Sequence, residues 1–348
     1  MRTGNFKETT EQSIALSDSR VVWGWTLAAT AMLLVAPFLI GNYTLTLMVS
    51  ALIAVIGAVG LNMLTGTTGL ISLGQAGFLA VGAYTNGILL TDYGLPVWLS
   101  LPAAGLASAA ISIFVGIPSL RLKGLYLAIT TLAFAFIINH VILYADVLTH
   151  GPNGLFVSGA EVFGVNLQKG KPLYYLTLGL TFATILAALN VSRTRIGRAW
   201  MAIRDHDIAA RVMGIDLVRY KLLAFFMSSF FVGIAGALIS LQIRFINIDV
   251  FALILSIEAL AIIILGGLGS IAGAVLGAVF LSFLPEAIRL FFEMFGNSES
   301  TLYTSYVYEI RGVAYGVVIV LFLRFKPEGL IGVWRDARKY WSNWPLAY

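Results

Sequence analysis

The feature that most constrains this chain is a series of long, nearly uncharged apolar segments between residues 23 and 325. A helix that crosses the hydrocarbon core of a bilayer needs ~20 mostly apolar residues. Segments of this kind lie at 23–41, 43–64, 72–90, 97–119, 124–144, 173–191, 221–241, 253–268, 270–291 and 310–325. These crossings use ~200 residues, so the rest of the 348 cannot form a sizeable soluble domain.

The segments are continuously apolar, whereas the strands of a membrane β-barrel alternate polar and apolar residues over ~10 positions. We therefore expect an all-α polytopic membrane protein with about ten transmembrane helices. The segments at 253–268 and 310–325 are short, and glycines at 66–69 and 266–269 are placed to break helices inside the bilayer. The expected count is therefore eight to ten, with Gly-broken helices among them.

The distribution of lysine and arginine predicts an orientation. With ten spans and a cytoplasmic N-terminus, 17 of the 22 basic residues lie on the cytoplasmic side, in agreement with the positive-inside rule. Both termini are then cytoplasmic. We expect a tail at 1–22, a transmembrane domain at 23–325 and a second tail at 326–348, with an outer loop at 145–172 and a polar cytoplasmic loop at 192–220.

Several classes of chemistry are excluded by what the sequence lacks. There is no cysteine, so thiolate catalysis and Cys-ligated metals are absent, and the three histidines lie apart in different segments. A Walker phosphate loop is also missing, because the only Gly-Lys pair, Gly170-Lys171, is followed by Pro172. We expect no metal site, no catalytic residues and no cofactor bound by this chain.

Polar side chains and glycines are concentrated at 62–75, between two apolar spans. Buried in hydrocarbon, such groups need partners from other helices, from a water-filled cavity or from a passing solute. Helix packing and a substrate path explain the run equally well. The motif at 69–72 also resembles the one at 267–270, and transporters often break helices at equivalent places in two halves. The candidate path residues here are Asn62, Thr65, Gly66, Gly69, Ser72, Gln75, Gly267, Gly269 and Ser270.

Glu258 is, in this interpretation, the only acidic residue deep within an apolar span, with no basic residue in a facing span. An intramembrane carboxylate is a functional candidate, although a structural hydrogen bond in the protonated form is the favoured explanation. We add it to the candidate path. The spacing of Gly269, Gly273 and Gly277 favours close packing of two helices.

The loop at 192–220 is the most polar part of the chain. Gly197 and Gly214 bracket good helix formers and predict a short cytoplasmic helix, with Gly214 as its C-cap. The loop also contains apolar residues that water disfavours: Trp200, Ile203, Ile208 and Met213. Charges beside exposed apolar side chains are typical of a surface that docks onto another protein.

At this loop the chain resembles the branched-chain amino acid ABC transporter permease family. The resemblance rests on the runs at 197–200, 202–205, 209–211, 221–225 and 233–238, with Gly214, and on those at 69–78 and 266–270. The run at 120–128 favours the LivM-like branch over the LivH-like branch.

The resemblance implies a permease subunit of an ATP-binding-cassette importer in the bacterial inner membrane. Its expected partners are a LivH-like second permease, two cytoplasmic ATPases that bind ATP and Mg, and a periplasmic substrate-binding protein. The expected solutes are branched-chain amino acids, moved by alternating access. By position, the residues expected to couple to the ATPases are Arg198, Trp200, Ile203, Arg204, Asp205, Ala209, Ala210 and Gly214.

Three alternatives stay open at this point. Permeases for urea or short amides resemble this family closely. An ion-coupled secondary transporter would use Glu258 and would work without an ATPase. An intramembrane enzyme is the weakest alternative, because no Ser-His set or paired aspartates lie at a suitable depth.

Overall fold

The computed structural model describes residues 20–120, 122, 124–162, 165–167, 170–295, 312, 313, 316, 317, 320–322, 324–326 and 328–343. Most of the expected tail at 1–22, much of the expected span at 310–325 and the last five residues therefore lie outside the described part of the chain.

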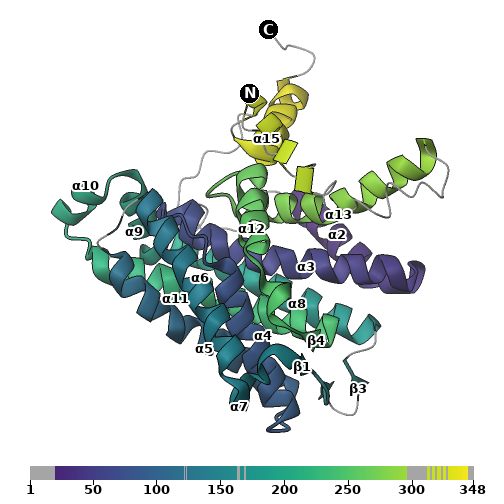
Figure 1. The fold of residues 1–348 in the computed structure, drawn as a ribbon. Helices are drawn as coiled ribbons and strands as arrows, with labels where there is room; N and C mark the ends of the chain where they lie inside the picture. Colours follow the sequence, from purple (N-terminus) through teal and green to yellow (C-terminus); the bar gives the residue numbers. More distant parts are fainter. Residues whose placement is uncertain are drawn as a thin grey trace.

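The described chain is a bundle of long helices (Figure 1). Their apolar residues are spread around the whole circumference, which is expected of helices surrounded by lipid and by one another. The long helices are α2 (Arg20–Leu39), α3 (Asn42–Leu61), α4 (Gln75–Thr91), α5 (Val97–Ser119), α6 (Leu125–Tyr144), α8 (Gly170–Arg193), α11 (Leu217–Ile243), α12 (Leu253–Gly266) and α13 (Ile271–Phe295).

Seven helical stretches of the described residues are long and apolar enough to cross a membrane. The chain is mostly helical, as expected for a polytopic membrane protein, but the expected count of eight to ten spans is not confirmed. Helix α2 is not among the seven, although its residues after Arg20 are mostly apolar. Helix α4 has 17 residues and begins at Gln75 rather than at 72, because the preceding residues are not helical.

Short elements connect the long helices at one end of the bundle, which we call the strand end (Figure 1). The expected outer loop at 145–172 contributes several of these elements, and its strand β1 pairs with β4, which follows α11, with Leu155 opposite Ile246. The short elements are α7 (Asp146–Thr149), η2 (Gly151–Asn153), β1 (Leu155–Phe156), β2 (Glu161–Val162), β3 (Val165–Asn166), β4 (Phe245–Ile246) and η3 (Ile248–Phe251).

The opposite end of the bundle, which we call the α9 end, holds two short helices between α8 and α11 (Figure 1). These are α9 (Arg195–Asp205) and α10 (Asp207–Val212). A further helix, α15 (Gly329–Asn343), lies over the end of α12 (Figure 1).

Helix α11 lies at the centre of the bundle and packs on α3, α4 and α5. Glycines permit this close approach: a Cβ added to Gly82 would overlap the Gly233 backbone, and one added to Gly236 would overlap the Leu79 carbonyl. These two contacts bring α4 and α11 together with almost no space between their backbones.

A buried hydrogen-bond network joins the same helices. The amide Nδ2 of Asn86 in α4 donates to Ser240 Oγ at 2.9 Å and to the Ala237 carbonyl at 3.3 Å, both in α11. Ser100 of α5 donates from Oγ to Asn86 Oδ1 at 2.7 Å. Because both ends of the Asn86 amide are satisfied, α4, α5 and α11 form a tightly connected core.

Candidate functional site

The chain leaves helical geometry at two places that together form one structure, which we call the joint. At the first, α3 passes into the π-helix η1 (Asn62–Gly66), residues 69–74 have no regular secondary structure, and α4 begins at Gln75. At the second, α12 ends at Gly266 and α13 begins at Ile271. Gly69 (φ +75°), Gly267 (+117°) and Gly269 (+78°) have positive φ angles that favour glycine. The expected helix breaks at 66–69 and 266–269 are both present.

The two breaks contact each other directly. Asn62 Oδ1 accepts a hydrogen bond from the Gly269 backbone N–H at 2.9 Å. A Cβ added to Gly66 would overlap Asn62 Oδ1 and would lie 2.5 Å from the Gly269 nitrogen. The similar motifs at 69–72 and 267–270 therefore belong to neighbouring parts of one joint.

The other polar side chains of the joint bond locally. Thr65 Oγ1 donates to the Leu70 carbonyl at 3.1 Å, and Ser72 Oγ accepts from the Gly74 N–H at 3.2 Å. Ser270 Oγ accepts from the Gly273 N–H at 3.1 Å, in the first turn of α13. These three side chains shape the two breaks and do not line the cavity described below.

Close packing of α12 on α13 agrees with the glycine spacing in the sequence. A Cβ added to Gly273 would lie 2.7 Å from the Gly266 carbonyl oxygen, and one added to Gly277 would overlap the Ile262 carbonyl. Helix α15 also reaches this place, because a Cβ on Gly267 would lie 2.5 Å from Ile331 Cγ2.

Helix α15 is held by ion pairs near its start. Lys326 Nζ lies 2.6 Å from Asp336 Oδ2, and Arg335 Nη1 lies 3.3 Å from Glu328 Oε2. The hydrogen bond from Lys326 to the Asp336 carboxylate raises the pKa of Lys326 above its ordinary value.

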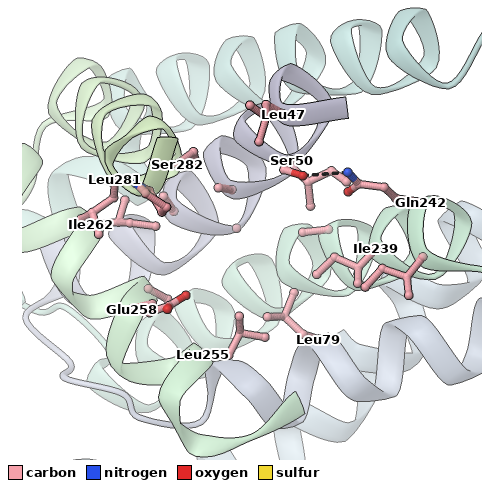
Figure 2. A pocket seen from close by; sticks show the side chains of 18 of the residues that line it. Leu47, Ser50, Leu79, Ile239, Gln242, Leu255, Glu258, Ile262, Leu281 and Ser282 are labelled. Carbon is pink, nitrogen blue, oxygen red and sulfur yellow. Dashed lines mark hydrogen bonds between the residues drawn. The ribbon is translucent and has the colours of Figure 1, made fainter. Parts of the chain in front are cut away.

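A cavity of about 530 Å³ lies between α3, α4, α11, α12 and α13 (Figure 2). This volume is typical of a small-molecule site. Of the candidate path residues, only Gln75 and Glu258 line it. Most of its wall is aliphatic and comes from Leu47, Ile53, Leu79, Ile239, Leu255, Ile262 and Leu281.

Gln75 is placed in the cavity wall by the first break, because it is the first residue of α4. Its side chain is 2% exposed, and Nε2 donates to the Gly57 carbonyl of α3 at 3.2 Å. The next residue, Ala76, donates its N–H to Ser256 Oγ of α12 at 2.9 Å. Glu258 lies two residues farther along α12, and its carboxylate is directed toward the cavity (Figure 2).

A second polar group lines the same cavity and was missed in the sequence. Tyr43 Oη donates to Glu286 Oε2 at 2.7 Å, and Arg289 Nε donates to the same oxygen at 3.1 Å. The Glu286–Arg289 pair lies near the end of the apolar stretch of α13, whereas Glu258 lies within α12, and neither member of the pair was among the residues predicted from the sequence. The Glu-x-x-Arg spacing in α13 was the available signal, since residues three apart share a helix face.

Gln242 of α11 completes the polar lining. Its Nε2 donates to Ser50 Oγ at 2.7 Å, across the opening between α11 and α3 (Figure 2). Gln242 lies in the last turn of α11, at the strand end of the bundle. No sequence pattern marked either residue, because single polar residues near a helix end are common.

The residues expected to couple to ATPases divide into buried and exposed groups. Trp200 (1% exposed), Ile203 (5%) and Ala210 (4%) are buried within this chain. Trp200 Nε1 also donates to the Tyr220 carbonyl at 2.9 Å. The interpretation of Trp200 and Ile203 as exposed apolar residues is therefore wrong, because they pack α9 onto its own bundle.

The exposed apolar residues lie on α10 and just after it: Ile208 (74% exposed), Val212 (80%) and Met213 (83%). Arg198, Arg204, Asp205, Ala209 and Gly214 are also exposed. The surface available to a partner is thus centred on α10.

The expected single helix of this loop is two helices, because His206 adopts an extended conformation (φ −156°, ψ 103°) between them. Gly197 does not bound the helix but lies within α9, which Thr194 caps by accepting the Ile196 N–H. Gly214 follows α10 with φ +85°, as predicted for a C-cap glycine.

Arg204 connects this loop to the joint. It lies in the last turn of α9, and its Nη1 donates to the Gly66 carbonyl at 2.8 Å. Gly69 and Gly269 both lie against it: a Cβ on Gly69 would be 3.2 Å from Arg204 Cγ, and one on Gly269 would be 2.5 Å from Nη1.

Comparison with known proteins agrees with this architecture. The family described as branched-chain amino acid transport system / permease component matches residues 43–323. The chain is 33% identical to the LivM permease protein of the high-affinity branched-chain amino acid transport system of Salmonella typhimurium, over 94% of this chain and 80% of that protein. It is 34% identical to LivM of Escherichia coli K12, over 93% and 79%, and 26% identical to BraD of Pseudomonas aeruginosa, over 79% and 90%. No solved structure matches the chain. The resemblance to LivM is confirmed, and the chain is a member of the branched-chain amino acid permease family.

Proposed function

We propose that this chain is the permease subunit of an ABC importer and that the cavity forms part of the path for branched-chain amino acids. The observation that supports this most is the chemistry of the cavity wall. Aliphatic side chains suit the apolar part of leucine, isoleucine or valine, while Gln75, Glu258 and the Glu286–Arg289 pair suit its charged backbone groups. Relatives named for high-affinity transport of these amino acids support the same substrate class.

The orientation follows from charge. In this proposal the α9 end faces the cytoplasm, because the loop between α8 and α11 carries arginines that the strand end lacks in comparable number among the described residues. Both termini are cytoplasmic when α2, α4 and the segment at 310–325 also cross the membrane, which makes the number of spans ten. The strand end then faces the periplasm, where a substrate-binding protein delivers its solute.

Energy comes from partners in this proposal. Two cytoplasmic ATPases bind ATP and Mg, and one of them docks on the surface that Ile208, Val212 and Met213 present on and beside α10. A LivH-like permease pairs with this chain in the bacterial inner membrane. Nucleotide-driven closure of the ATPases moves the two permeases between outward-open and inward-open states.

The test is reconstitution. Co-expression of this chain with its second permease and two ATPases, followed by uptake assays in proteoliposomes with loaded binding protein, should show ATP-dependent accumulation of labelled leucine. Uptake by this chain alone, driven by an ion gradient, would instead identify a secondary transporter. Accumulation of urea or short amides in place of leucine would change the substrate class and leave the ATP-driven mechanism in place.

A further inference from the structure

We propose that Arg204 is a positioning residue for transport: it ties the docking loop to the cavity through the joint. The inference rests on the proposed function, since it needs an ATPase to move α9. It differs from the expectation that Arg204 contacts the ATPase, because its observed hydrogen bond is to Gly66 within this chain.

Helix α9 is suited to act as a rigid lever. Trp200 is buried and bonded to the Tyr220 carbonyl of α11, and Ile203 packs with Ala210 and Leu217 in a small apolar cluster. Because Ile203 of α9 packs against Ala210 of α10, a displacement of α10 by a docked partner is transmitted to α9 through this contact.

The Arg204 side chain fits a socket that only glycines permit. Gly69 lies against its aliphatic part and Gly269 against Nη1, and both have positive φ angles. Gly66 supplies the carbonyl that accepts the hydrogen bond from Nη1. One guanidinium thus contacts both breaks of the joint.

The joint in turn contacts the cavity. Gly269 is bonded to Asn62, which couples the α12–α13 break to the end of α3. From Gly69 the non-helical segment leads in six residues to Gln75 in the cavity wall. The adjacent bond from Ala76 to Ser256 reaches α12, the helix of Glu258.

The joint also has a reason to rearrange. Asn62 is completely buried, and its Nδ2 has no hydrogen-bond partner among the described residues. An unsatisfied buried donor raises the free energy of the arrangement that contains it. A second arrangement that satisfies this amide would therefore compete with the observed one, as a two-state element requires.

The experiment uses the complete transporter in nanodiscs. Because this chain has no cysteine, Ala54→Cys places a single thiol in the cavity wall. The partner subunits are used as cysteine-free variants, so that only this thiol can be labelled. Maleimide labelling is measured with and without ATP and vanadate, beside ATPase activity, uptake and subunit co-purification. The variants are Arg204→Gln, Arg204→Lys and the control Arg195→Gln, which removes a charge from the exposed start of α9.

We expect the Arg204→Gln complex to assemble and to hydrolyse ATP. Its uptake should fall by at least about tenfold, which is the effect expected for the loss of one charged hydrogen bond. The ATP-dependent change in labelling should also be lost. Arg204→Lys keeps the charge and one donor, so it should restore part of both signals even if the Gln variant folds poorly. Arg195→Gln should behave as the wild type. If Arg204 had only a structural role, its replacement would lower the yield of the complex, and the purified complex would lose ATP hydrolysis and ATP-dependent labelling to the same extent.

Retention of uptake and of ATP-dependent labelling in Arg204→Gln would overturn the inference. Loss of ATPase co-purification in that variant would overturn it as well, because Arg204 would then be a partner contact. The labelling does not depend on which solute is carried. A wild-type complex whose labelling ignores ATP would refute the proposed ATP-driven function itself, and the inference with it.

Discussion

Replacing Gln75 with leucine separates the transport role of the cavity wall from its structural role. Leucine nearly matches glutamine in size, so the substitution leaves no large void between α4 and α3. It removes one hydrogen bond, from Nε2 to the Gly57 carbonyl at 3.2 Å, and that carbonyl remains available to its own helix. Hydrogen bonds between membrane helices contribute ~0.6 kcal/mol on average, so the loss of stability should be below about 1 kcal/mol.

The effect on transport should be much larger. A polar wall group that meets a charged solute contributes ~1–3 kcal/mol, which corresponds to roughly 5- to 150-fold in rate or affinity. We therefore expect Gln75→Leu to lower ATP-dependent uptake by about tenfold or more, while thermal unfolding of the purified complex barely shifts.

Asn86→Leu is the matched control, because it also replaces a buried amide in α4 but lies outside the cavity lining. It removes three hydrogen bonds instead of one, for an expected loss of ~2 kcal/mol. Uptake per folded complex should stay within about twofold of the wild type. Wild-type uptake in Gln75→Leu, or equal transport losses in the two variants, would refute the assignment of Gln75 to the path.

Three further substitutions test the loop and the joint. Gly214→Ala should destabilise the end of α10 by ~1 kcal/mol because of its positive φ, seen as faster amide exchange over 207–212, whereas Gly214→Asn should be milder. Met213→Asp should weaken ATPase co-purification without affecting membrane insertion, because it places a charge at a side chain that is 83% exposed. Unchanged co-purification would show that the docking surface does not include Met213. Gly267→Ala should destabilise the complex by ~1–3 kcal/mol, because the added Cβ meets Ile331 and alanine disfavours a φ of +117°. Thermal unfolding measures the loss of stability, and an unchanged midpoint would contradict the tight contact.

The features that the sequence predicted correctly are local ones. Apolar length located the long helices, and glycine clusters located both breaks of the joint. The C-cap role of Gly214 and the close packing around Gly273 likewise depend only on backbone geometry near one residue.

The features that were missed depend on tertiary contacts. Apolar residues in a polar loop pack either on a partner or on their own chain, and the two cases have the same sequence pattern. Trp200 and Ile203 pack on their own chain. Glu286 and Arg289 were overlooked because hydropathy averages hide an ion pair near the end of a span. Which candidate path residues line the cavity depends on how five helices meet, and no local signal contains that arrangement.

The distribution of polar contacts indicates where the bundle can move. On one side of the cavity, α4, α5 and α11 share the saturated Asn86 network and backbone-to-backbone glycine contacts, so a relative displacement of these helices would cost several interactions at once. On the other side, one hydrogen bond joins Ala76 of α4 to Ser256 of α12, and another joins Gly269 to Asn62, whose Nδ2 has no partner among the described residues. Conformational change should therefore concentrate at α12 and the joint, and both Arg204 and α15 contact the joint from the α9 end. Amide exchange in the assembled transporter should then be slowest in α11 and should respond to ATP first in α12.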